Sequence, residues 1–97
     1  MDSAKLGQYV NEKWDSDIVP QLVEYIRIPN KSPMFDADWV QNGYMEQAVE
    51  LMATWAKAQD LPGLTVEVVR LEGRTPLILL EIPATGPETG EDTVLLY

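Results

Sequence analysis

The chain has 97 residues, of which 45% are hydrophobic and 24% charged, a composition typical of a folded domain and not of a disordered segment. Its 7 basic and 16 acidic side chains give a net charge of −9, which argues against electrostatic binding to nucleic acid or to an anionic membrane surface. Cysteine and histidine are both absent, which excludes disulfides, thiolate chemistry and the usual zinc ligands from these residues.

The sequence also bears on where the protein acts. Residues 1–7, M-D-S-A-K-L-G, do not combine a basic segment with an apolar core. No apolar run approaches the ~20 residues that a membrane span requires. We therefore expect a cytoplasmic protein that does not bind a membrane.

The first part of the chain predicts helix. Asp2 and Ser3 are suitable N-caps, and apolar residues then recur at helical spacing. Pro20 interrupts this pattern, because a proline inside a helix costs ~3 kcal/mol. That cost largely vanishes if Asp17 caps a second segment, since the first four N–H groups of a helix have no intrahelical partner. We predict either two segments or one helix kinked near residues 15–17.

The second segment predicts a buried face and a defined end. Its apolar residues at helical spacing are Ile18, Leu22, Tyr25 and Ile26. Pro29 excludes helical geometry at the residue before it, so the helix is expected to end by Ile28. Residues 29–33, P-N-K-S-P, form a stiff polar loop, which is either a plain connection between helices or the edge of a substrate pocket.

A second amphipathic helix is predicted over residues 43–59. One stripe accounts for its large apolar side chains, which makes them core residues and not a ligand platform. The members of this stripe are Tyr44, Ala48, Leu51, Met52 and Trp55. The following residues, D-L-P-G at 60–63, cannot continue the helix.

After Gly63 the pattern changes from helical to extended. Residues 65–70 and 77–82 are rich in β-branched or apolar side chains and predict two strands of an antiparallel hairpin. Residues 83–92 have the composition of a surface loop. Residues 93–97, T-V-L-L-Y, predict a third strand covered on both faces, and in α/β proteins the chemistry usually lies just beyond such a strand.

A search for catalytic motifs identifies no site. Residues 86–90, G-P-E-T-G, lack the lysine and helix of a phosphate-binding loop, and no nucleophile elbow is present. The carboxylate pairs Asp36 with Asp38 and Glu91 with Asp92 are too few for a calcium site, so solvated loop charge is the better interpretation. We predict no catalytic, substrate-binding or metal-ligating residue in these 97 positions.

A resemblance to a known family adds to this reading. Residues 18–29, I-V-P-Q-L-V-E-Y-I-R-I-P, resemble the N-terminal helix and following turn of the co-catalytic zinc metallopeptidases that include carnosinase, carboxypeptidase G, aminoacylase and succinyl-diaminopimelate desuccinylase. A tryptophan-bearing helix, strands at 65–70 and 76–82, and the D-T-V-L-L-Y run at 92–97 follow in the same order, and the dipeptidase branch is the most similar. The similarity covers nearly the whole sequence.

The resemblance implies a fold class, a domain and a function. The fold would be α/β, with residues 1–97 forming a single partial domain, the N-terminal part of a three-layer α/β/α sandwich with a mixed sheet. The family's Gly-His-x-Asp segment and its other metal ligands would follow Tyr97, so no family site residue maps onto this chain. The parent enzyme would use two zinc ions, or cobalt or manganese, to hydrolyse dipeptides or acyl-amino acids, and the fragment alone would be inert.

Two alternatives differ in class from the peptidase hypothesis. One is a non-catalytic truncated product that serves as an interaction module, and the other is an unrelated small α+β binding domain. In an isolated fragment, the elements that would cover one face of the apolar strands and pair their open edge are missing, and exposed strand edges recruit other chains. We therefore expect self-association through residues 93–97.

Overall fold

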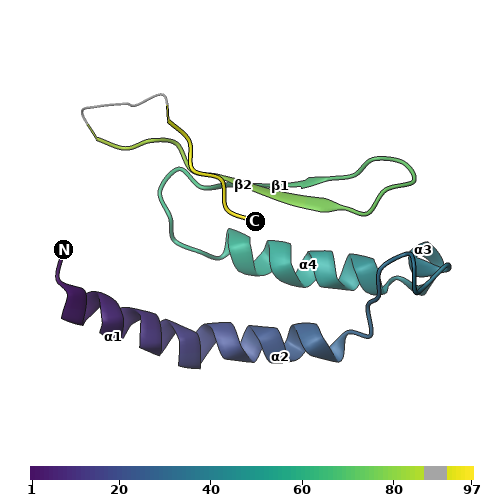
Figure 1. Ribbon diagram of the computed structural model, residues 1–97, viewed down its shortest axis with the longest axis horizontal. Helices are drawn as coiled ribbons and strands as arrows, with labels where there is room; N and C mark the ends of the chain where they lie inside the picture. The colour runs from purple at the N-terminus through teal and green to yellow at the C-terminus, as the bar shows by residue number, and fades with distance from the viewer. Residues whose placement is uncertain (87–91) are drawn as a thin grey trace. The chain divides into compact units, whose positions relative to one another are not determined.

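The computed structural model describes residues 1–86 and 92–97 (Figure 1). Helices come first along the chain, and a two-stranded antiparallel sheet follows them, which confirms the predicted mixed α/β class. The residues cluster into two compact units, Met1–Met52 and Ala53–Tyr97, and the boundary between these units falls inside helix α4.

The first helix, α1 (Ser3–Lys13), begins at the predicted cap. The carboxylate of Asp2 accepts hydrogen bonds from the backbone N–H groups of Ala4 at 3.0 Å and Lys5 at 3.2 Å. These bonds satisfy donors that have no partner within the helix.

A π-helical turn, η1 (Trp14–Ile18), joins α1 to α2 (Val19–Arg27). The N–H of Val19 donates to the carbonyl of Trp14, five residues earlier, so the turn is wider than an α-helical one. Pro20 lies in the first turn of α2, where its missing N–H is tolerated. The predicted break near residues 15–17 is therefore confirmed, but Asp17 does not cap α2, because it lies within η1 and the N-cap residue is Ile18, which makes no side-chain cap bond. Figure 1 shows that α1 and α2 follow one another as a nearly continuous helical rod.

The end of α2 agrees with the sequence analysis, but its predicted buried face does not. Ile28 caps the helix in an extended conformation, as Pro29 requires. Of the four residues predicted on this face, Ile18 is half-buried, whereas Leu22, Tyr25 and Ile26 are exposed, Ile26 to 76%. Amphipathic spacing identified the apolar stripe correctly, but among the described residues no partner surface covers Ile26, which explains the difference.

A short helix, α3 (Trp39–Asn42), was not predicted. It ends at Gly43, whose φ of 73° lies in the left-handed region that glycine adopts without strain. Helix α4 (Tyr44–Lys57) begins immediately afterwards and matches the prediction of residues 43–59 to within two residues at each end.

Helix α4 carries the buried residues of the described chain, and they extend beyond the predicted stripe. Within the stripe, Ala48 is buried, and Tyr44, Leu51, Met52 and Trp55 are half-buried. The other buried residues are Val49, Ala53 and Ala56. The sequence analysis looked for large apolar side chains and therefore did not include these three smaller residues. Their small side chains allow other parts of the chain to pack closely against this side of the helix.

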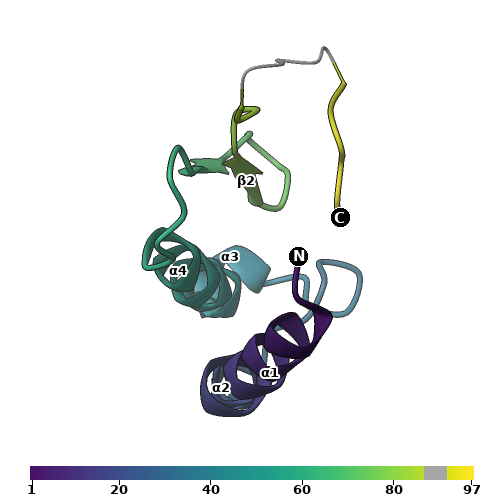
Figure 2. The same cartoon turned by 90° about the vertical axis from the view of Figure 1, so that its left-hand side faces the viewer.

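The sheet consists of β1 (Thr65–Val69) and β2 (Leu77–Glu81), which lie side by side in Figures 1 and 2. They pair antiparallel as predicted, with Glu67 opposite Leu79 at the centre. Directly opposed residues share a face of the sheet. On one face Val66, Val68 and Ile78 are half-buried and Leu80 is exposed. On the other face Val69 is half-buried, and Leu77 and Leu79 are exposed.

The predicted third strand is not confirmed. Residues 92–97 are described by the structure, and they belong to neither strand of its sheet. A strand forms only when a neighbouring strand pairs with its backbone groups, and apolar composition alone does not supply that neighbour. The three-layer sandwich is likewise not confirmed, because its remaining layers would have to come from further elements.

Candidate functional site

The loop predicted as a possible pocket edge, residues 29–33, is held by local backbone bonds. The N–H of Asn30 donates to the Ile28 carbonyl at 2.7 Å, and the Ser32 carbonyl accepts from Phe35 at 2.9 Å and Asp36 at 3.1 Å. The amide of Asn30 also donates to the sulfur of Met45 at 3.6 Å, which connects the loop to the start of α4. These contacts define a rigid connection between helices, and they do not create a polar cluster for a substrate.

The carboxylate pair Asp36 and Asp38 has a structural arrangement. Both oxygens of Asp36 accept from the side-chain amide of Asn42, at 2.9 and 3.0 Å, and one also accepts from the Asp38 backbone N–H at 3.2 Å. Asp36 therefore fastens the loop to α3, a role more specific than the solvated charge that the sequence predicted. Of the second pair, Glu91 lies outside the described residues.

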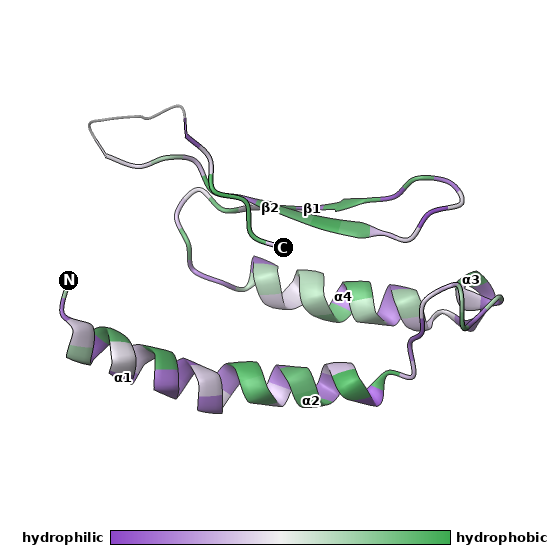
Figure 3. Cartoon of the chain, viewed as in Figure 1, coloured by the Kyte–Doolittle hydropathy of each residue, from purple (hydrophilic) through white to green (hydrophobic). Residues whose placement is uncertain are grey.

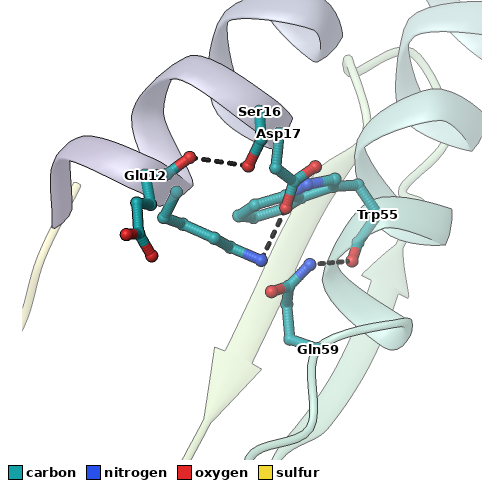
Figure 4. A network of polar contacts seen from close by, with 6 residues as sticks. Glu12, Ser16, Asp17, Trp55 and Gln59 are labelled. Atoms are coloured by element: carbon teal, nitrogen blue, oxygen red, sulfur yellow. Dashed lines mark hydrogen bonds and ion pairs between the residues drawn. The ribbon is translucent and has the colours of Figure 1, made fainter. Parts of the chain in front are cut away.

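Polar side chains also meet along η1 (Figure 4). The hydroxyl of Ser16 donates to the Glu12 carbonyl at 2.6 Å, and the ammonium of Lys13 pairs with the Asp17 carboxylate at 2.5 Å. The hydrogen bond to Asp17, together with its charge, raises the pKa of Lys13 above its ordinary value of 10.5. The i, i+4 spacing of Lys13 and Asp17 is a signal that the sequence analysis could have used.

A separate contact belongs to the second unit. The side-chain amide of Gln59 donates to the carbonyl of Trp55 at 2.9 Å (Figure 4). The same carbonyl accepts from the backbone N–H of Ala58 at 3.2 Å, so the amide of Gln59 adds a second bond at the end of α4. Like the contacts along η1, it serves local structure.

The described part of the chain does not fit a zinc site. Across residues 1–86 and 92–97, no group of three or more histidine, cysteine, aspartate or glutamate side chains is arranged to hold a metal ion. Nor does any helix in those ranges have the length and apolar character needed to cross a bilayer. We therefore assign no step of a metal-dependent reaction to these residues.

Comparison with known proteins does not identify the chain. No model of a known protein family matches the sequence, and no curated protein matches it at a significant level. The resemblance described above consequently rests on residues 18–29 and on the order of the elements that follow them.

Proposed function

We propose that this chain is the N-terminal part of the catalytic domain of a zinc-dependent exopeptidase or amidase that hydrolyses dipeptides or acyl-amino acids. The observation that carries the proposal is the stretch at residues 18–29, in which an amphipathic helix ends in an R-I-P turn. The end of α2 at Arg27 and the extended Ile28 before Pro29 support it, because they give the stretch the helix-then-turn form that the resemblance requires.

The small number of buried side chains also supports this proposal. Among the described residues, no large side chain is fully buried, and the only buried residues are Ala48, Val49, Ala53 and Ala56. A stable domain of this length normally buries well over half of the surface of its unfolded chain. Additional helices and strands of a larger sandwich would supply the missing cover for α2 and for the sheet.

The proposal assigns catalysis to the parent enzyme and not to the residues described. Because these residues do not fit a metal centre, the two zinc ions, or cobalt or manganese in their place, would be bound by residues that follow position 97. The isolated chain is then a scaffold without activity. Its substrate, a dipeptide or an acyl-amino acid, belongs to the same proposal, and a cytoplasmic location stays a prediction.

The coding sequence downstream of the Tyr97 codon provides the most direct test. An in-frame Gly-His-x-Asp segment is expected, and the extended protein should hydrolyse dipeptides or acyl-amino acids when zinc, cobalt or manganese is added. An early stop codon would contradict the proposal and favour a truncated product.

The purified 97-residue chain tests the assignment of the site. We expect no hydrolysis of a dipeptide panel with any of the three metals, because two-metal hydrolysis needs ligands held on several loops. Turnover that persists through successive purification steps and is abolished by a chelator would show that the ligands lie within residues 1–97.

An interaction module is the second candidate, and the exposed apolar residues of α2 and β2 favour it (Figure 3). Each of these two elements separately exposes several large apolar side chains, and exposed apolar side chains gathered on one element are typical of a binding face. If the chain is an interaction module, the reading frame should end near residue 97. The purified chain should then hydrolyse none of the dipeptides or acyl-amino acids tested, with any of the three metals. An unrelated α+β binding domain would have the same two properties.

A further inference from the structure

The two outer edges of the sheet formed by β1 and β2 are not equivalent. A two-stranded sheet is marginally stable in water, and a third strand with a hydrophobic face is normally needed for independent stability. Each outer edge presents backbone N–H and C=O groups that an additional strand can pair with. The residues that flank each strand decide which of the two edges is open.

Prolines flank β2 at both ends. Pro76 immediately precedes the strand and Pro83 follows it by two residues, and neither has an N–H to donate. Residues seven apart on an extended chain point their backbone N–H groups to opposite edges, so one of the two prolines removes a donor from the outer edge of β2. A ladder on this edge would therefore be interrupted at one end of β2.

The outer edge of β1 has no such obstruction. No proline occurs between positions 64 and 70, and four of the five residues of β1 are β-branched. Glu67 is the one charged side chain in the strand, and it lies on the exposed face opposite Leu79. Natural proteins protect edges with prolines and charges, so β1 is the less protected edge.

Residues 93–97, T-V-L-L-Y, have the properties of a strand that lacks a partner. They contain no proline, glycine or charged side chain, and their number equals that of β1. Each of the four side chains from Val94 to Tyr97 is at least 79% exposed. The structure describes this segment, and it joins neither β1 nor β2.

We propose that the outer edge of β1 binds residues 93–97 of a second copy of the chain, and that the exchange is reciprocal, so that two copies form a closed dimer. In strand addition, main-chain hydrogen bonds supply affinity while alternate side chains enter the partner's surface. Reciprocal exchange uses both free edges and both free segments, which gives the self-complementary interface of a two-fold dimer. A second copy is the occupant because, in a single chain, the hairpin is formed while the segment stays unpaired.

The net charge predicts how this dimer responds to salt. Each chain carries −9, so the two copies repel one another, and raising the ionic strength screens that repulsion. Association should therefore strengthen as salt is added, the opposite of what an interface built on ion pairs would show. The inference does not depend on the peptidase proposal, because it uses only the sheet and residues 93–97.

Cysteine cross-linking tests the edge, because the natural sequence has no cysteine to interfere. One copy carries Glu67→Cys on β1 or, as the matched control, Leu79→Cys on β2, and the other copy carries a cysteine at position 94, 95 or 96. Glu67 and Leu79 are direct partners, so they lie at the same level and on the same face of the sheet. A strand on the β1 edge lies within disulfide distance of position 67 but is a further strand spacing from position 79.

Mixed disulfides should form at least about tenfold faster with Glu67→Cys than with Leu79→Cys in a glutathione buffer, with the chains at micromolar concentration. Equal rates, or faster reaction at position 79, would overturn the assignment to β1. A single chain that carries both cysteines provides a further test. If its disulfide forms within the chain at a rate that does not fall on dilution, the segment binds its own sheet and not that of a second copy.

Sedimentation tests the dimer without relying on cross-links. The natural chain should sediment as a dimer at micromolar concentration, and Leu95→Pro should be monomeric because it removes a backbone donor from the segment. Leu95→Ala is the matched control, since it keeps that donor, and it should retain most of the association. A natural chain that is monomeric throughout, at both low and high salt, would overturn the proposal.

Discussion

Helices α2 and α4 are both amphipathic, yet their apolar faces are covered to very different extents. All of the buried residues in the described chain lie on α4, over an arc wider than its large apolar residues predicted. On α2, the residues of the corresponding stripe, Leu22, Tyr25 and Ile26, are all exposed, Ile26 to 76%. The sequence of α2 would suit a buried position equally well.

The difference shows that spacing and burial are separate properties. A helix forms its apolar stripe from local sequence, but the partner that covers this stripe is contributed by other elements. Small residues such as Ala53 and Ala56 permit close packing around α4, whereas the larger residues of α2 gain free energy only when a partner is present. Substitutions on the two helices should therefore have unequal effects on stability.

The largest effect is expected for a charge introduced at the buried side of α4. Ala53→Glu should lower the free energy of unfolding by about 3 kcal/mol or more, because an unpaired carboxylate is costly to bury. Thr54→Glu is the matched control: it adds the same charge at the next, exposed position and should cost less than about 0.5 kcal/mol. Urea denaturation measures both, and equal losses would mean that α4 is not covered where Ala53 lies.

Truncation of a half-buried residue on the same helix should have a smaller effect. Leu51→Ala is expected to cost about 1–2 kcal/mol, roughly half of the value for a fully buried leucine, while the neighbouring Glu50→Ala should change stability little. Comparable losses at the two positions in denaturant titrations would indicate that the helical face has been misassigned.

On α2, removal of an apolar side chain should cost almost nothing in the isolated chain. Ile26→Gln is expected to change the free energy of unfolding by less than about 0.5 kcal/mol, because most of the side chain is already in water. A loss above about 1.5 kcal/mol by urea titration would contradict the contrast between the helices. In a longer protein that covers α2, the same substitution should become clearly destabilising.

The smallest effect concerns the ion pair along η1. Because Asp17 raises the pKa of Lys13 above 10.5, the contribution of this pair is fully present below that pH and is lost as the pH rises through the raised value. The melting temperature of Lys13→Met should therefore lie slightly below that of the natural chain at about pH 8, and the difference should shrink as the pH rises through the raised pKa of Lys13. A gap that widens with increasing pH would contradict the assigned direction of the shift.

Local signals in the sequence were sufficient for the longer helices and the hairpin. Asp2 predicted the first cap, Pro20 predicted the break at η1, and Pro29 predicted the end of α2, since each acts through its own backbone or its nearest neighbours. Helix α3 was missed because its four residues are too few to show a periodic pattern. The role of Asp36 was missed because its partner Asn42 lies six positions away, beyond the spacing of a helical pair.

Burial and pairing could not be predicted to the same extent. The apolar run at residues 93–97 has strand character, but a strand requires an edge to pair with, and such an edge is a property of the assembled sheet. The buried arc of α4 is wider than predicted because it includes alanines. Alanine favours helix on any face, so its position in the sequence does not indicate burial. No functional site was predicted from the residues, and apart from the contact between Asn30 and Met45 the polar side-chain contacts reported for the described residues are local.

The π-helical turn has a consequence for the direction in which the apolar residues of the rod point. Ile26 follows Val10 by sixteen residues, and at about 100° per residue an unbroken α-helix would set these side chains about 160° apart. The extra residue that η1 accommodates turns α2 back by about 100°, which leaves them about 60° apart. The stripes of α1 and α2 thus point to within about 60° of one another, and deletion of one residue within η1, which would restore an unbroken α-helix, should preserve this alignment.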